Sequence, residues 1–283
     1  MNEDAGLEEQ ISIEHALKAW TQLQTETARL DVECLLCFVL NCDSTYLRTW
    51  PDKQLTSEHY THFKKLLARR IKGEPIAHIC GSRAFWTLDL LVTPDTLIPR
   101  PDTEILVEQI LELKLSEKAH ILDLGTGTGA IALSLASERP AWKVTATDFL
   151  PEVVELAKRN AQKYQLTNTH IFQSDWFDQI PPEKFDLIVS NPPYIDPEDK
   201  HLAEGDVRFE PLSALIADQH GLADIEHIIK QSKSYLKKQA WLVLEHGYDQ
   251  ASEVQALFSK YNYIDIKTIK DYGQKDRMTM ARN

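Results

Sequence analysis

The sequence contains few cysteines, and their spacing argues against a metal or redox centre. There are four, at positions 34, 37, 42 and 80. Cys34 and Cys37 form a C-x-x-C pair inside an apolar helical run, 32–40, and no second pair completes a zinc set. We therefore expect buried free thiols and no bound metal.

Long apolar runs are also missing. No stretch approaches the roughly 20 residues that a helix needs to span a bilayer. The first nine residues are acidic and contain neither an apolar signal region nor an arginine-rich transit pattern. These absences predict a cytoplasmic protein with no membrane partner.

Positive charge is in deficit, with 31 Lys and Arg residues against 43 Asp and Glu residues and a net charge of −12. Nucleic-acid binders use Lys and Arg to displace counterions from phosphates, so we expect no nucleic-acid partner. One basic run is interpreted as the solvated face of a helix. It comprises Lys64, Lys65, Arg69, Arg70 and Lys72.

The apolar pattern divides the chain into three parts. Apolar residues recur at helical spacing from Ile11 to Lys72 and predict a small all-helical domain, 1–75, of about four helices. Asp31 and Asp52 are expected near helix starts. A β-like stretch then predicts a β-hairpin linker, 76–98, which leads into a larger domain, 99–283.

The larger domain alternates strands with helices. The predicted strands are 120–124, 143–148, 169–173, 186–190, 240–246, 263–269 and 277–281. The predicted helices are 130–138, 151–164, 222–236 and 250–260. This order indicates an α/β fold with a Rossmann-like, mostly parallel, seven-stranded sheet, whose ligands bind at the carboxyl ends of the strands.

A glycine loop joins the first of these strands to its helix. It reads Gly125, Thr126, Gly127, Thr128, Gly129, and no lysine follows, so it is not a Walker phosphate loop. The next strand ends at Asp148, where a carboxylate can accept hydrogen bonds from ribose hydroxyls. Loop and acid together predict a nucleoside site, for NAD or for S-adenosylmethionine.

The third strand is followed by Asp175 and Trp176. Asp175 can accept from an adenine amino group and Trp176 can cover the ring, although a turn aspartate and a core tryptophan would give the same pattern.

The fourth strand ends in Asn191, Pro192, Pro193 and Tyr194. The prolines remove two backbone donors and stiffen the chain. What remains is a corner of acceptors, the Asn191 side-chain oxygen and the Pro192 carbonyl, beside the aromatic plane of Tyr194. A planar NH2 group fits such a corner, so we predict Asn191, Pro192 and Tyr194 as catalytic residues, with Pro193 completing the substrate contact. Taken alone, these residues would equally suit a rigid strand-to-loop turn, but the glycine loop in the same domain favours the acceptor corner.

Together these motifs look like those of the class I S-adenosylmethionine-dependent methyltransferases. Over nearly its whole length the chain resembles the release factor glutamine methyltransferases (the HemK/PrmC family). Besides the motifs above, the segments that carry this resemblance include 97–104, 208–211 and 244–247. The resemblance implies S-adenosylmethionine as cofactor and S-adenosylhomocysteine as product, held by Gly125–Gly129, Asp148, Trp176 and Asn191. It also implies that the substrate is the glutamine of the Gly-Gly-Gln motif in peptide chain release factors, and that Asn191–Tyr194 bind its side-chain amide. Such an enzyme would tune translation termination.

Three rivals stay open. An adenine N6-methyltransferase would present the same NH2 group to the same motif, but would need a flipped base and a basic groove. A ribosomal-protein glutamine methyltransferase differs only in its partner, and a non-catalytic nucleotide-binding module would not need the acceptor corner.

We expect a monomer whose helical domain recognises the partner protein. Arg100, Arg208, Glu245 and His246 have no assigned role, beyond a guess that Arg208 orders the substrate loop and that His201 and His246 are structural.

Overall fold

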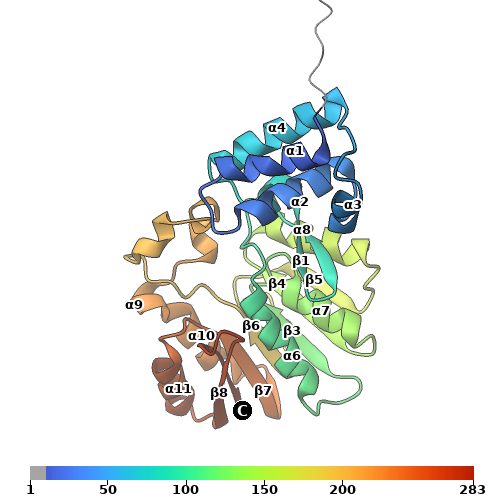
Figure 1. The fold of residues 1–283 in the computed structure, drawn as a ribbon. Helices are drawn as coiled ribbons and strands as arrows, with labels where there is room; N and C mark the ends of the chain where they lie inside the picture. Colours follow the sequence, from blue (N-terminus) through green and yellow to red (C-terminus); the bar gives the residue numbers. More distant parts are fainter. Residues whose placement is uncertain (1–10) are drawn as a thin grey trace, which may run out of the picture. The chain divides into compact units, whose positions relative to one another are not determined.

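The computed structural model describes residues 11–283, and the chain divides into two compact units, Met1–Gly81 and Ser82–Asn283 (Figure 1). The acidic start on which the expectation of no targeting peptide depends lies outside the described residues. In the part that is described, no helix is both long and apolar enough to cross a membrane.

The first unit is helical, as expected. Its helices are α1 Ile13–Leu17, a 3-10 helix Lys18–Gln22, α2 Ala28–Leu40, α3 Ser44–Thr49, α4 Ser57–Ile71 and α5 Ile76–Cys80. Thr56 caps α4 by accepting from the His59 N–H, so the expectation of a helix start near Asp52 is wrong. Asp31 does lie in the first turn of α2. Residues 76–81, predicted as linker, belong to this unit.

Arg70 corrects the interpretation of the basic run. Lys64, Lys65, Arg69 and Lys72 are exposed, but Arg70 is only 5% exposed. Its Nε donates to Asp31 Oδ2 at 2.8 Å, so the pair ties α4 to α2 through the core of the unit. The four cysteines are free but half-buried rather than buried.

Replacing Arg70 by Met is expected to destabilise the helical unit by about 3–5 kcal/mol, because Asp31 would keep a buried charge without its partner. Denaturant unfolding followed by circular dichroism measures this. Lys64→Met on the exposed face of the same helix should change the free energy of unfolding by less than about 0.5 kcal/mol. Equal losses in the two variants would contradict a structural role for the pair.

The second unit begins with an antiparallel hairpin, β1 Ser82–Phe85 and β2 Leu88–Leu91, in which Ser82 lies opposite Leu91. Phe85, Leu88 and Leu90 are buried in the same core cluster as α6 Glu104–Glu112. The hairpin is therefore part of the larger unit's core.

The sheet has seven strands in the order β5-β4-β3-β6-β7-β9-β8. β9 pairs antiparallel with both β7 and β8, and the other four strand pairs are parallel, which confirms the predicted fold class. The strands are β3 His120–Leu124, β4 Lys143–Asp148, β5 Thr169–Gln173, β6 Phe185–Ser190, β7 Leu236–Glu245, β8 Ile264–Lys270 and β9 Asp276–Arg282. The helices that follow α6 are α7 Ala130–Glu138, α8 Pro151–Lys163, α9 Asp218–Gly221, α10 Ala223–Ser232 and α11 Ala251–Lys260.

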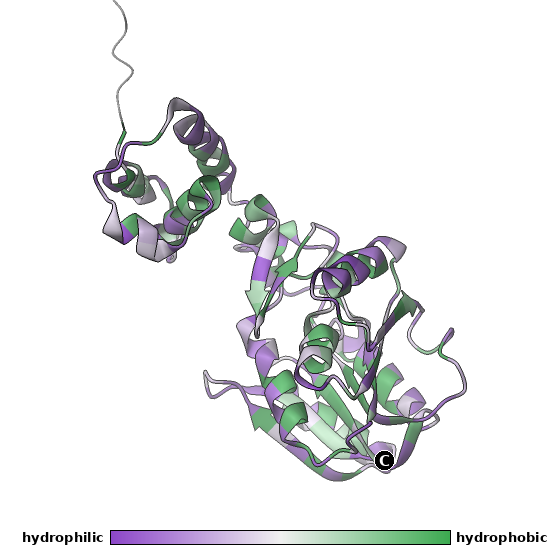
Figure 2. Cartoon of the chain, turned by 90° about the vertical axis from the view of Figure 1, so that its right-hand side faces the viewer, coloured by the Kyte–Doolittle hydropathy of each residue, from purple (hydrophilic) through white to green (hydrophobic). Residues whose placement is uncertain are grey.

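The helices form a layer on each face of the sheet. Alternate strand residues separate the two cores: Ile121 packs with α6, α7 and α8, whereas Leu122 packs with α10 and α11. The central strands accordingly appear apolar in Figure 2. Two adjoining boundaries differ from expectation by four residues each, because α10 ends at Ser232 and β7 already begins at Leu236. Residues 237–239 are polar and exposed, so the hydrophobic pattern did not predict that the strand begins before them.

The strand order explains where a ligand can bind. Strands β4 and β6 flank β3 on opposite sides, so the chain reverses its direction of winding there. Ligands of such sheets bind at the carboxyl ends of the strands beside this switch point. The glycine loop after β3, Asp148 at the end of β4 and Asn191 after β6 must therefore meet.

Candidate active site

The glycine loop is fixed by hydrogen bonds of Thr126 and by close packing at Gly129. Thr126 donates its N–H to the Thr147 carbonyl at 2.9 Å and its hydroxyl to Asp123 Oδ2 at 2.6 Å. Gly129 has φ +87°, and a Cβ there would lie 2.8 Å from the Leu133 side chain. Only glycine lets the loop pass this closely over the start of α7.

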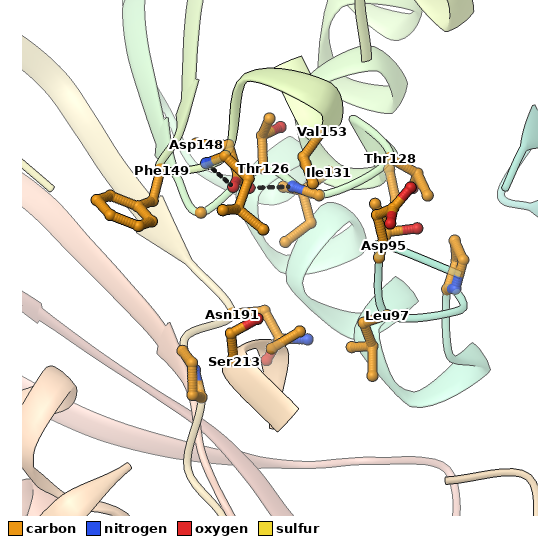
Figure 3. Close-up of a pocket in the computed structure, with 18 of the residues that line it drawn as sticks. Asp95, Leu97, Thr126, Thr128, Ile131, Asp148, Phe149, Val153, Asn191 and Ser213 are labelled. Atoms are coloured by element: carbon orange, nitrogen blue, oxygen red, sulfur yellow. Dashed lines mark hydrogen bonds between the residues drawn. The ribbon is translucent and has the colours of Figure 1, made fainter. Parts of the chain in front are cut away.

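Asp148 joins the second strand to this loop. Its Oδ2 accepts from the Gly127 N–H at 2.9 Å, as Figure 3 shows, and its Oδ1 accepts from the Leu150 N–H at 3.3 Å. Burial raises the pKa of Asp148, while these backbone donors lower it. Each carboxylate oxygen retains a lone pair, so the side chain can still accept from ribose hydroxyls.

A cavity of about 350 Å³ lies over these strand ends. Of the predicted residues, those that line it are Gly125, Thr126, Gly127, Thr128, Asp148, Asp175, Trp176, Asn191 and Pro193. Gly129, Pro192 and Tyr194 lie outside its wall. Trp176 lines the cavity beside Gly125 and also packs against the core, so both interpretations of this tryptophan describe part of its environment.

Sequence reasoning missed much of the wall. The segment before α6 contributes Asp95, Thr96, Leu97, Pro99, Arg100 and Thr103, and later segments contribute Phe149, Ser213 and Asp224. In Figure 3 Leu97 and Asn191 lie across the cavity from Asp148. The paired prolines at 99 and 101 were the only local signal that this segment is held in a defined extended shape.

The charge of the cavity wall favours S-adenosylmethionine over NAD as the cofactor. Its charged side chains are four carboxylates, Asp95, Asp148, Asp175 and Asp224, and one guanidinium, Arg100. A dinucleotide would bring a pyrophosphate into this acidic cavity, whereas S-adenosylmethionine brings a sulfonium and an ammonium group. The free N–H groups at the start of α7 can donate hydrogen bonds to its carboxylate. The residues present fit S-adenosylmethionine.

Arg100 is held by an ion pair that sequence reasoning did not find. Its guanidinium contacts Glu210 Oε2 at 2.6 Å, and Glu210 Oε1 accepts from the Ile98 N–H at 3.1 Å. The pair joins two segments of the cavity wall that are 110 residues apart. Arg208 does not line the cavity, and its guanidinium lies 5.0 Å from the Phe209 ring centroid.

The two histidines considered near the crevice both have hydrogen-bonded positions. His246 is fully buried, with Nε2 at 2.8 Å from Thr279 Oγ1 and Nδ1 at 2.8 Å from the Gly247 carbonyl. Burial lowers its pKa. His201 is exposed and bonds to Asp199. A structural role suits both.

The acceptor corner has a defined orientation. Asn191 Nδ2 donates to Thr103 Oγ1 at 3.2 Å. Among the described residues, no hydrogen-bond donor contacts the Asn191 Oδ1. The Tyr194 hydroxyl donates to Glu245 Oε1 at 3.1 Å, and burial raises the pKa of this tyrosine. Asn191 therefore presents an unused acceptor at the cavity, while the Tyr194 hydroxyl is directed into the protein.

Gly221 and Gln250 hold the backbone of this corner. Gln250 Nε2 donates to the Tyr194 carbonyl at 3.0 Å. Gly221 has φ +80°, and a Cβ there would lie 2.0 Å from the same carbonyl oxygen. The isolated glycine before the predicted helix 222–236 was a signal for such a close approach.

Gly221→Ala is expected to reduce turnover at least about 10-fold, because the added methyl group would displace the Tyr194 backbone and with it Asn191. Steady-state kinetics with a thermal unfolding curve measure this. Gly81→Ala is a matched control, since Gly81 has φ +74° but no atom within 4 Å of an added Cβ. If both variants lose activity equally, backbone strain rather than the clash is responsible.

Comparisons with known proteins identify the family of both parts of the chain. Residues 101–206 match the family model of the methyltransferase small domain, and residues 12–81 match that of the PrmC N-terminal domain. The fold is similar to that of a methyltransferase from Pyrococcus furiosus, with a TM-score of 0.55 and 20% identity over 77% of this chain and 98% of the other. That likeness concerns the fold alone.

Closer relatives cover both units. The chain is 50% identical to the release factor glutamine methyltransferase of Shewanella oneidensis over 97% of each chain. It is 51% identical to that of Escherichia coli over 94% of this chain and 96% of the other. With such identity over nearly its full length, the chain belongs to the family of release factor glutamine methyltransferases.

Proposed function

We propose that this protein methylates the side-chain amide nitrogen of the glutamine in the Gly-Gly-Gln motif of peptide chain release factors. The observation that carries the proposal is the position of Asn191. Its unused amide oxygen faces the cavity that also contains the glycine loop and Asp148. An acceptor for a planar NH2 group thus lies beside a nucleoside site.

The cavity residues divide between the cofactor and the substrate. S-adenosylmethionine, when bound, supplies a methyl group on a sulfonium centre. Gly125–Gly129 and Asp148 would hold its amino-acid and ribose parts, with Asp175 and Trp176 at the adenine. Phe149 and Val153 add apolar wall beside Asp148, which excludes water from this end of the cavity.

Asn191 and Pro192 act on the substrate amide, whose nitrogen is a poor nucleophile because its lone pair is delocalised into the carbonyl. The Asn191 oxygen accepts one of its N–H bonds, which places the nitrogen and favours positive charge on it. We assign the other N–H bond to the Pro192 carbonyl, and because Pro192 is buried outside the cavity wall, this contact requires the loop to shift when the substrate binds. Such preorganised partners contribute about 3 kcal/mol each. Alignment of the nitrogen within the cavity supplies much of the remaining acceleration.

No general base is needed for this reaction. The methylated amide nitrogen is very acidic while it still carries its proton, so it loses that proton readily to water. Tyr194 supports the corner through its carbonyl and its hydroxyl, which bond to Gln250 and Glu245.

We assign recognition of the release factor to the helical unit. All residues that line the cavity belong to Ser82–Asn283, so the helical unit is not required to form the cofactor site. Because the helical unit contributes no residue to that site, its surface is available to bind the folded release factor.

The reaction is tested by methyl transfer from labelled S-adenosylmethionine. The acceptors are a release factor, its Gly-Gly-Gln variant with Gln→Ala, ribosomal proteins and unmethylated duplex DNA. Label on the intact release factor alone supports the proposal. Label on DNA would identify an adenine methyltransferase instead, label on a ribosomal protein would change the partner, and label on none of them would refute the proposed substrate.

A further inference from the structure

One buried side-chain amide connects the glycine loop to the hairpin. Asn160 of α8 is fully buried and lies outside the cavity wall. Its Oδ1 accepts from the Leu91 N–H at 2.8 Å, and its Nδ2 donates to the Leu91 carbonyl at 3.0 Å and to the Thr128 carbonyl at 2.9 Å. Both hydrogens of the NH2 group and the amide oxygen are therefore bonded, which fixes the orientation of the amide.

The two bonds to Leu91 have a counterpart on the same strand. The Tyr164 hydroxyl, directly after α8, accepts from the Asp89 N–H at 2.6 Å and donates to the Asp89 carbonyl at 2.8 Å. Four positions along a helix cover about the same length as two along a strand, so α8 bonds to β2 as a neighbouring strand would. In this role Asn160 and Tyr164 are equivalent.

The third bond distinguishes Asn160 from Tyr164. It holds the carbonyl of the peptide that joins Thr128 to Gly129, and the N–H of that peptide donates to the Thr126 carbonyl at 2.9 Å. Gly129 has φ +87°, and a glycine lets the peptide before it rotate at little cost. Thr128 lines the cavity (Figure 3), so the Asn160 bond keeps this part of the cavity wall in one shape.

Leu91 leads into another part of the cavity wall. The chain after it, 92–100, contributes most of the wall residues that precede α6, and Pro94 stiffens the connection. Glu210 holds the far end of this segment through the Ile98 N–H. The near end follows Leu91, so its position depends on α8.

We propose that Asn160 is a positioning residue for the cofactor, because one amide fixes the separation between Thr128 and the segment 92–100. Walls that already stand at the required separation bind S-adenosylmethionine without the free-energy cost of ordering them. The inference adds a residue that touches neither cofactor nor substrate. It rests on the cofactor site of the function proposed above and does not depend on which protein is methylated.

Asn160→Asp tests the inference with almost no change of shape. The variant keeps an acceptor for the Leu91 N–H, but its second oxygen faces the Leu91 and Thr128 carbonyls and repels them. We expect the dissociation constant of S-adenosylhomocysteine, measured by calorimetric titration, to rise at least about 10-fold. Turnover at saturating S-adenosylmethionine should stay within about threefold of the wild type, since the acceptor corner is unchanged.

Tyr164→Phe is the matched control. It removes both bonds to Asp89 on the same strand but no bond to the glycine loop. Its thermal unfolding midpoint should fall by about 2–4 °C, whereas the dissociation constant of S-adenosylhomocysteine should change by less than about threefold. Equal dissociation constants for Asn160→Asp and Tyr164→Phe would overturn the inference, because Asn160 would then only support the hairpin.

Hydrogen exchange of the wild type decides the question if Asn160→Asp does not fold. The N–H groups of Leu91 and Asp89 are bonded to Asn160 and Tyr164 on the same strand. Saturating S-adenosylhomocysteine should slow exchange at Leu91 at least about 10-fold more than at Asp89, because the cofactor binds tightly only while the Asn160 bonds are closed. Equal slowing at the two positions would overturn the inference.

The outcomes separate this inference from the proposed function. If the expected changes in cofactor binding are found and the wild type methylates no release factor, the inference is supported and the proposed substrate is wrong. A folded wild type that does not bind S-adenosylhomocysteine overturns both.

Discussion

Asn191→Ala is expected to lower kcat by roughly 100- to 1,000-fold, the effect of deleting one preorganised hydrogen-bond partner of a transition state. The substitution removes the amide oxygen of Asn191, a side-chain acceptor that lines the cavity directly after β6. The glycine loop and Asp148 stay in place, so the dissociation constant of S-adenosylmethionine should change by less than about threefold. Single-turnover kinetics and calorimetric titration measure the two quantities separately.

Asp148→Ala is the reciprocal control. This variant loses the acceptor of the Gly127 N–H and the ribose contact, so cofactor affinity should fall at least about 10-fold. Once the cofactor is saturating, much of the turnover should return. An Asn191→Ala variant that loses affinity and turnover in equal measure would place Asn191 in the cofactor site and contradict its role as substrate acceptor.

Deletion of Met1–Gly81 is expected to lower kcat/KM for an intact release factor at least about 100-fold, which corresponds to about 3 kcal/mol of lost binding energy. The cut falls between the two compact units and keeps the hairpin Ser82–Leu91, whose residues Phe85 and Leu90 are buried in the remaining core. Cofactor affinity should be preserved, because every residue of the cavity wall is retained.

A short peptide that contains the Gly-Gly-Gln motif controls this experiment. The peptide offers the corner its glutamine but no folded surface, so the full chain and the shortened chain should methylate it at similar rates. If the deletion abolishes cofactor binding, the helical unit supports the fold of the second unit. If methylation of the intact release factor survives, recognition lies within Ser82–Asn283.

Several parts of the site could be read from the sequence because their signals are local. The apolar run 185–189 had to become a buried parallel strand, and the residues after it had to lie at the ligand edge of the sheet. The glycine loop and Asp148 follow from the same topology. Cofactor choice was less certain, since NAD and S-adenosylmethionine share the loop and the acid; the acidic cavity wall distinguishes them.

The sequence by itself therefore determined the elements, their order and the edge of the sheet at which chemistry occurs, because periodicity and turn residues act over a few positions. Only the tertiary structure decided which distant side chains meet. Three hydrogen-bonded pairs show this, and their partners lie 39, 88 and 51 residues apart in the sequence: Arg70 and Asp31, Thr103 and Asn191, and Glu245 and Tyr194. Periodicity assigns a residue to a buried face, but its partner there depends on how whole elements pack. Gly221 belongs to the same class, since its requirement comes from a carbonyl 27 positions away that only packing brings to it.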